Sequence, residues 1–211
     1  FRSTCSKTIQ IVTICGLICS IFCMFEARDI NIALFKSGAF DDKSVEMTTT
    51  ALVFYSFAVV TTLLRDMLKN ISFAMQNTRS PLVGSLINCA VNVVIMVLFT
   101  RRYGIAIITL STTIASLVEM LFLFVLVNQQ ENIVDFRQTA INGAYSLVAI
   151  LLAGYLVTLI PISPLGDERL NSLLAIAIRG IVYLALSVVL LLPLLTMSKN
   201  RELVKSLRRK T

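Results

Sequence analysis

The length of the apolar blocks is the feature that most constrains this chain. Six blocks are dominated by aliphatic and aromatic side chains, namely residues 8–27, 48–70, 82–100, 105–127, 140–160 and 172–196. About 20 apolar residues in a helix cross the hydrocarbon core of a bilayer. Because lipid offers no hydrogen-bond partners, such segments span it as α-helices. The sequence therefore predicts an all-α, polytopic transmembrane bundle with six spanning helices, the first of which can continue to Leu34.

Composition supports this prediction and excludes several classes of protein. Hydrophobic residues make up 56% of the chain and charged residues 15%, whereas soluble domains contain roughly 45–50% apolar and 25% charged residues. Apolar residues in long blocks argue against disorder and against a β-sandwich. The chain contains no His, which excludes His-based triads and His metal sites. Little length remains for a catalytic domain, so we do not expect an enzyme.

The polar connectors between the blocks are short, which predicts antiparallel neighbouring helices. With the N-terminus on the cytoplasmic side, eleven Lys and Arg residues lie on the inner side and five on the outer side. Cytoplasmic loops of membrane proteins carry an excess of these residues. The sequence therefore predicts a cytoplasmic C-terminus, and six cations in the tail, residues 198–211, carry most of that argument.

This basic tail has two interpretations. Its cations Lys205, Arg208, Arg209 and Lys210 are interspersed with aliphatic residues at helical spacing, so the tail can lie on an anionic cytoplasmic leaflet. The alternative is a solvated anchor that fixes the orientation of the last helix. A nucleic-acid site would interleave aromatic residues with the cations, and the tail has none. We therefore expect membrane lipids, and no nucleic acid, as its partner.

Four ionisable residues within the predicted spans are candidate transport residues. Glu119 lies near the middle of the fourth block, and Arg65, Asp66 and Lys69 cluster in the second. An ionised side chain in a span requires a partner of opposite charge or a watery cavity. Asp66 and Lys69 are three residues apart on a helix and are able to pair. Structural ion pairing, a protonated Glu119, and a direct role in transport all stay open.

Amide and hydroxyl side chains form a candidate cation site. Asn88 and Asn92 share one face of the third block. Four hydroxyl residues lie early in the fourth block, namely Thr109, Ser111, Thr112 and Thr113. Oxygen atoms from two adjacent helices can replace part of the hydration shell of a cation. Alternatively, the same groups hydrogen-bond each other and hold the helices together.

The remaining polar groups suggest structural roles. Arg179 is expected to reach the outer headgroups, and Arg28 with Asp29 to mark the outer end of the first span. Cys15, Cys19 and Cys23 repeat every four residues on one helix face. With no His or paired Cys-x-x-Cys motif beside them, helix packing is favoured over a metal or redox stripe.

Four motifs, in order, resemble those of one membrane protein family. They are LFKSGAF at 34–40, ALVFYS at 51–56, SFAMQNTRSP at 72–81 and RRYGIAIITLS at 101–111. In this order they resemble the MurJ/MviN family, the lipid II flippases of the multidrug/oligosaccharidyl-lipid/polysaccharide exporter superfamily. The chain departs from the family pattern at Ala58, which stands for Gly, and at Asn77, which stands for Asp.

The resemblance implies a domain organisation. The six spans correspond to the last six of the family's fourteen helices. Residues 1–130 contain four helices of the C-terminal lobe, and residues 131–197 contain two further helices that can form a groove for a lipid tail. Residues 198–211 form the cytoplasmic tail. The chain begins at Phe1 without a signal-peptide pattern. We therefore expect the N-terminal lobe to be a missing partner from a longer polypeptide.

The resemblance also implies a function. The family translocates the peptidoglycan precursor lipid II across the bacterial cytoplasmic membrane by alternating access, so a lipid-linked oligosaccharide is the expected substrate and cell-wall synthesis proteins are expected partners. No cofactor is implied. Some members bind sodium through an Asn-x-x-x-Asp pair, and Asn92 stands where the carboxylate would be, which weakens any coupling to a monovalent cation. A polysaccharide or multidrug exporter and a non-transporting membrane scaffold remain alternatives.

Overall fold

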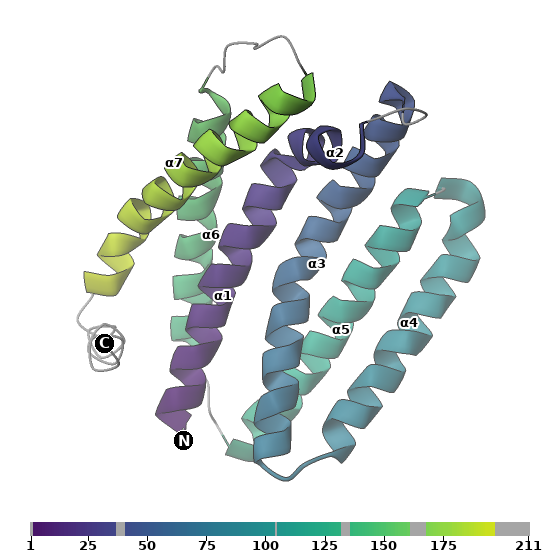
Figure 1. Ribbon diagram of the computed structural model, residues 1–211. Coiled ribbons are helices and arrows are strands. Elements are labelled where there is room, and N and C mark those ends of the chain that lie inside the picture. Colours follow the sequence, from purple (N-terminus) through teal and green to yellow (C-terminus); the bar gives the residue numbers. More distant parts are fainter. Residues whose placement is uncertain (1, 37–40, 104, 132–135, 161–167, 197–211) are drawn as a thin grey trace.

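The computed structural model describes residues 2–36, 41–103, 105–131, 136–160 and 168–196, and within these ranges the chain is helical and has no strand (Figure 1). The helices are α1 (Arg2–Phe25), α2 (Ala27–Phe35), α3 (Asp42–Ala74), α4 (Arg79–Tyr103), α5 (Ile105–Glu131), α6 (Phe136–Thr158) and α7 (Glu168–Thr196). The predicted all-α class is confirmed.

Six of these helices are long and apolar enough to cross a membrane, which confirms the number and the approximate places of the predicted spans. Their apolar segments are Cys5–Phe25, Asp42–Ala74, Arg79–Arg101, Ile107–Gln129, Ile141–Thr158 and Arg169–Pro193. These six helices make the chain a multi-pass membrane protein. Large apolar side chains on their outer faces are exposed, for example Val97 at 72% and Ile181 at 71%. Such extensive apolar exposure is the surface that hydrocarbon requires and water disfavours.

Two boundaries differ from the prediction. The first span does not continue to Leu34, because the helix is interrupted at Glu26 and the short helix α2 turns away across the end of α1 (Figure 1). The connector expected up to Met47 is also partly helical. Asp41 caps α3, since its carboxylate accepts a hydrogen bond from the backbone N–H of Ser44 at 2.9 Å, and an aspartate in this position favours helix initiation.

The spanning helices form a row in which contacts run from α4 to α5, α3, α1, α6 and α7 (Figure 1). Two apolar clusters lie inside it, and α1 contributes to both. One joins α1, α3 and α5 through Cys5, Ile9, Leu68, Ile71, Leu123 and Val127. The other joins α1, α6 and α7 through Leu17, Ile21, Ala149, Ile150, Ala153, Val157, Tyr183 and Leu191.

Candidate functional site

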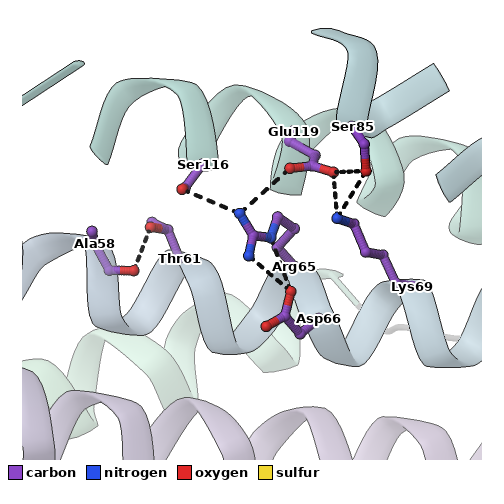
Figure 2. A network of polar contacts seen from close by, with 8 residues as sticks. All are labelled: Ala58, Thr61, Arg65, Asp66, Lys69, Ser85, Ser116 and Glu119. Atoms are coloured by element: carbon purple, nitrogen blue, oxygen red, sulfur yellow. Dashed lines mark hydrogen bonds and ion pairs between the residues drawn. The ribbon is translucent and has the colours of Figure 1, made fainter. Parts of the chain in front are cut away.

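A cluster of charged side chains lies where α3, α4 and α5 meet (Figure 2). Its centre is Glu119, whose side chain is only 1% exposed. Lys69 Nζ lies 2.8 Å from Glu119 Oε1, and Arg65 Nη1 lies 3.5 Å from Oε2. Both cations come from α3, one helical turn apart, and therefore point to the same side, towards α5.

Hydroxyl groups and a second acid complete the cluster. Ser85 on α4 donates to Glu119 Oε1 at 3.3 Å and accepts from Lys69 Nζ at 3.0 Å, which ties α4 to the ion pair (Figure 2). Arg65 Nη1 donates to Ser116 Oγ at 3.5 Å. The other edge of the guanidinium binds Asp66, with Nε and Nη2 at 3.0 and 2.9 Å from Oδ1.

The cluster balances its charges within a span. Two cations, Arg65 and Lys69, face two acids, Asp66 and Glu119, so the formal charges cancel. A buried charge is stable only when it is paired and its remaining hydrogen-bonding capacity is used. The sequence prediction that Asp66 is able to pair with Lys69 is not realised. Arg65 binds Asp66 instead, because Lys69 turns towards the buried carboxylate of Glu119.

Gly84 allows α4 to approach this cluster closely. A Cβ atom built at Gly84 would lie 3.4 Å from Cγ of Glu119 and 3.5 Å from Cδ2 of Leu123. These are ordinary van der Waals distances for a Cβ atom, so a side chain longer than Ala is what would meet the stem of Glu119. The short distance between the α4 backbone and Glu119 explains how the neighbouring Ser85 hydroxyl reaches the carboxylate.

The candidate cation site is only partly assembled by hydrogen bonds. Ser111 Oγ on α5 donates to Asn92 Oδ1 on α4 at 2.9 Å, so the hydroxyl bound to Asn92 lies two residues beyond the predicted Thr109. The backbone carbonyl of Thr109 accepts from Thr113 Oγ1 at 3.0 Å. Asn88 Nδ2 is buried and finds no hydrogen-bond partner within the described part of the chain. Cation binding at these residues stays a prediction.

A second charged network, which the sequence reasoning missed, joins α7 to the junction of α1 and α2. Arg179 Nη1 lies 3.1 Å from Asp29 Oδ2 and 3.4 Å from Glu26 Oε2. Nη2 donates to the carbonyl of Ile160 at 3.4 Å, and Ser172 Oγ donates to Asp29 at 3.5 Å. The expectation that Arg179 reaches the headgroups is wrong, because two acids bind its guanidinium within the protein.

Glu26 explains why this network forms. Its side chain is 1% exposed, and burial raises its pKa, while the nearby Arg179 acts in the opposite direction. The sequence contained a signal for this network. Glu26 is an acid at the end of the block 8–27, and Arg179 is an Arg inside the block 172–196. Ionisable residues near or within spans require partners, so the two could have been matched.

Comparison with known proteins identifies the family. The sequence profile described as Lipid II flippase MurJ matches residues 1–179. The chain belongs to the MurJ lipid II flippase family. This is the family whose motifs the sequence resembles.

Individual MurJ relatives are distant in sequence and longer. The lipid II flippase MurJ of Thermosipho africanus (strain TCF52B) is 24% identical over 164 residues, which are 78% of this chain and 32% of that protein. The probable lipid II flippase MurJ of Treponema pallidum (strain Nichols) is 25% identical over 124 residues, 59% of this chain and 24% of the relative. The chain thus spans about a third or less of the length of these relatives.

A solved MurJ structure shares the fold. The lipid II flippase MurJ in an inward closed conformation matches with a TM-score of 0.75 and 18% identity, over 92% of this chain and 40% of that chain. Of the predicted site residues in this MurJ-family chain, the structure joins Arg65, Asp66, Lys69 and Glu119 in one cluster. The predicted membrane-surface residues Lys205, Arg208, Arg209 and Lys210 lie outside the described residues.

Proposed function

We propose that the full-length protein translocates lipid II across the bacterial cytoplasmic membrane by alternating access, and that this chain supplies the later helices of the transporter. The observation that carries the proposal is the match of the MurJ flippase profile to residues 1–179. The shared fold over 92% of the chain supports it. In this role the protein moves a lipid-linked oligosaccharide without converting it, and residues 1–130 belong to the C-terminal lobe, whose partner is the N-terminal lobe.

The charged cluster has a mechanical role in this proposal. Alternating access requires groups of helices that move as rigid bodies. Glu119 on α5 is bonded to Lys69 on α3 and to Ser85 on α4, so it links three helices at one depth. We assign the cluster the task of keeping α3, α4 and α5 together while the lobe moves. Polar links of this kind are worth more in hydrocarbon than at a surface, because water does not compete for them.

Helices α6 and α7 each expose large apolar side chains, for example Val148 and Leu152 on α6 and Ile181 and Val188 on α7, which suits the proposed groove for the substrate's lipid tail within 131–197. The tail 198–211 lies in the cytoplasm in this proposal, with its cations on the anionic leaflet. Cell-wall synthesis proteins are the proposed partners on the basis of the substrate alone.

The proposal includes no cofactor and no strong coupling to a monovalent cation. Asn92 offers a neutral amide oxygen, already bound by Ser111 Oγ at 2.9 Å. A neutral ligand holds a hard cation less tightly than a carboxylate does. We therefore propose that Asn88, Asn92 and Thr109 bind sodium weakly, and that translocation rates change little when sodium is replaced by a large organic cation.

Genetic replacement tests the proposed function. The full-length protein is expressed in bacteria whose own lipid II flippase is depleted, and growth and the cellular lipid II level are followed. We expect growth to be restored and lipid II not to accumulate, with an empty vector as the control. Good expression in the membrane without rescue contradicts the proposal, and restored export of polysaccharide or drugs in matched transporter-deficient strains would favour the alternative exporters.

A further inference from the structure

Glu26, Asp29 and Arg179 form a largely buried group whose formal charges do not cancel, and we call it the Glu26 triad. Two acids face one cation, since Arg179 Nη1 lies 3.4 Å from Glu26 Oε2 and 3.1 Å from Asp29 Oδ2. The cluster around Glu119, by contrast, has two cations for its two acids. With both carboxylates ionised, the triad would carry an uncompensated negative charge at Glu26, whose side chain is 1% exposed. Such a charge is strongly unfavourable.

The elements packed around the triad supply no second cation within the described residues. Arg28 on α2 and Lys43 at the start of α3 are exposed and form no ion pair with either acid. Lys36 binds Asp42 at 2.7 Å, and Arg169 donates to the carbonyl of Ala33 at 3.2 Å. The other titratable groups at this end of the packed helices are acids, a thiol and phenols, namely Glu46 on α3, Cys23 on α1, Tyr155 on α6 and Tyr183 on α7.

The hydrogen bonds of the triad indicate where the compensating charge lies. A guanidinium has five N–H donors, and two ionised carboxylates, which repel each other, would use separate nitrogens. Both acids instead meet at Nη1 of Arg179, while Nη2 donates to the carbonyl of Ile160 at 3.4 Å and the buried Nε finds no acceptor in the described chain. Glu26 Oε1 is likewise buried and has no hydrogen-bond partner there. Two carboxyl groups that share one site favour a state in which one of them is protonated.

The surroundings of Glu26 also favour its protonated form. Burial raises the pKa of Glu26, Arg179 acts in the opposite direction, and Asp29 raises the pKa further through its charge and a hydrogen bond. A proton on Glu26 removes the uncompensated charge and leaves Asp29 ionised against Arg179. The side chain of Asp29 is 27% exposed, so it connects the buried acid to water, with which the proton is exchanged.

We propose that Glu26 is a proton-binding site, and that its proton keeps α2 and α7 docked on the end of α1. The triad lies where these helices meet, because Asp29 is in the first turn of α2 and Arg179 is on α7. Ser172 on α7 also donates to Asp29 at 3.5 Å. Release of the proton to water leaves two negative charges at one nitrogen, so the acids repel each other and the contact of α2 with α7 weakens. Arg179 is the cation of the triad in both protonation states.

The pH dependence of unfolding tests the site. Because the pKa of Glu26 is raised above its ordinary value of 4.5, the folded protein keeps this proton at pH values where the unfolded chain has released it. The contribution of the proton to stability is therefore complete below that ordinary value and is lost as the pH rises through the raised pKa. Across this interval the ratio of folded to unfolded protein falls by up to about tenfold per pH unit.

Two variants of similar shape isolate the contribution of Glu26. The full-length protein in detergent is unfolded with denaturant at pH values from about 5 to about 8. Glu26→Gln places a neutral amide where the protonated acid stands, so we expect its folded-to-unfolded ratio, relative to the wild type, to rise by at least about tenfold over this range. Asp29→Asn removes the charge that opposes ionisation of Glu26 and is expected to flatten the pH dependence. Glu46→Gln, which changes an exposed acid of α3, is the control and should follow the wild type.

The opposite results are equally definite. If Glu26→Gln is less stable than the wild type by the same factor at every pH, Glu26 is a permanently ionised partner of Arg179 and the proton site is overturned. It is also overturned if neither variant folds. If Glu26→Gln alone does not fold, Asp29→Asn decides, since a flat curve supports the site and the wild-type curve overturns it.

Replacing sodium with a large organic cation separates a proton from a metal ion as the occupant. We expect the curves to stay unchanged, and a curve that depends on sodium at constant pH would overturn the proton site. The inference goes beyond lipid II translocation and does not rest on it. Because translocation is not measured in this test, failure of the proton site leaves the proposed function standing.

Discussion

At the scale of single residues, buried charge is the main constraint on this protein. Glu119 is 1% exposed and has Lys69 at 2.8 Å and Arg65 at 3.5 Å. Desolvating these groups is costly, and only the mutual attraction and the added hydrogen bonds offset the cost. Removing one member therefore leaves the others unsatisfied in a place that water does not reach easily.

Glu119→Gln is predicted to destabilise the protein strongly. Loss of one partner of a buried ion pair costs about 3–5 kcal/mol, and the lower end applies because both cations are about one-fifth exposed. Thermal unfolding in detergent measures the effect. Asp66→Asn is the matched control, because Asp66 binds the same Arg65 but is half exposed, and exposed pairs contribute about 0–1 kcal/mol. Equal stability of Glu119→Gln and the wild type would refute the structural role of the cluster.

Arg179→Met is predicted to loosen the junction of α1, α2 and α7. The change leaves Glu26 buried without its cation. Because loss of one partner of a buried ion pair is costly, we expect the free energy of unfolding to fall by about 3 kcal/mol. Arg169→Met is the control, since Arg169 is an exposed residue that donates to the carbonyl of Ala33 at 3.2 Å. The prediction fails if both variants unfold at the same temperature.

Sequence reasoning reached some of these residues and not others, for a physical reason. The requirement that Glu119 have a partner follows from its place in an apolar block, whatever the fold. Which cation pairs with Glu119 depends on how α3 and α5 are aligned. The spacing along α3 alone suggested that Lys69 was able to pair with Asp66. The need of Glu26 and Arg179 for partners was visible in the sequence, but the two lie 153 positions apart, so no local spacing pointed from one to the other.

At the scale of helices, the boundaries follow hydrophobicity and the contacts follow side-chain size. The spans were predictable because a bilayer fixes the length of each apolar block. The interruption at Glu26 was not, because the apolar pattern continues through Ile30, Ile32 and Leu34. Small residues can permit close helix contacts, and two glycines of α6 differ in whether they do so.

Gly154→Ala is predicted to disturb the packing of α6 on α1, whereas Gly143→Ala on the same helix is not. A Cβ atom at Gly154 would lie 2.6 Å from the Phe25 ring and 3.2 Å from Ile21, while one at Gly143 meets nothing within 4 Å. Overpacking costs about 1–3 kcal/mol, and Ala in place of an unhindered helical Gly stabilises by up to about 1 kcal/mol.

Unfolding temperatures of the two variants, measured in the same detergent, provide the comparison. A second variant, Phe25→Leu combined with Gly154→Ala, is expected to recover part of the loss by making room for the new methyl group. If Gly154→Ala is as stable as Gly143→Ala, the close contact between α1 and α6 does not exist in the membrane.

At the scale of the whole molecule, α1 is the element that connects two groups of helices. Cys5 and Ile9 near its N-terminus pack with α3 and α5, and Leu17 and Ile21 further along pack with α6 and α7. Ser20 also donates a hydrogen bond to the carbonyl of Ser56 on α3. The charged cluster stabilises the first group, and the network around Arg179 ties α7 to the end of α1. Helix α1 thus links the α3–α5 side of the row to the α6–α7 side, and α4, α5 and α7 expose large apolar side chains on their outer faces.

Lipid II translocation by the full-length protein is the decisive measurement. Spheroplasts depleted of their own flippase are supplied with the protein, and an enzyme that cleaves lipid II is added to the outside, where it reaches only molecules that have crossed. We expect the externally cleaved fraction to rise to that of cells with their own flippase, and to fall with Glu119→Gln more than with Asp66→Asn. A cleaved fraction equal to that of depleted cells, with the protein folded in the membrane, would contradict a role in lipid II translocation.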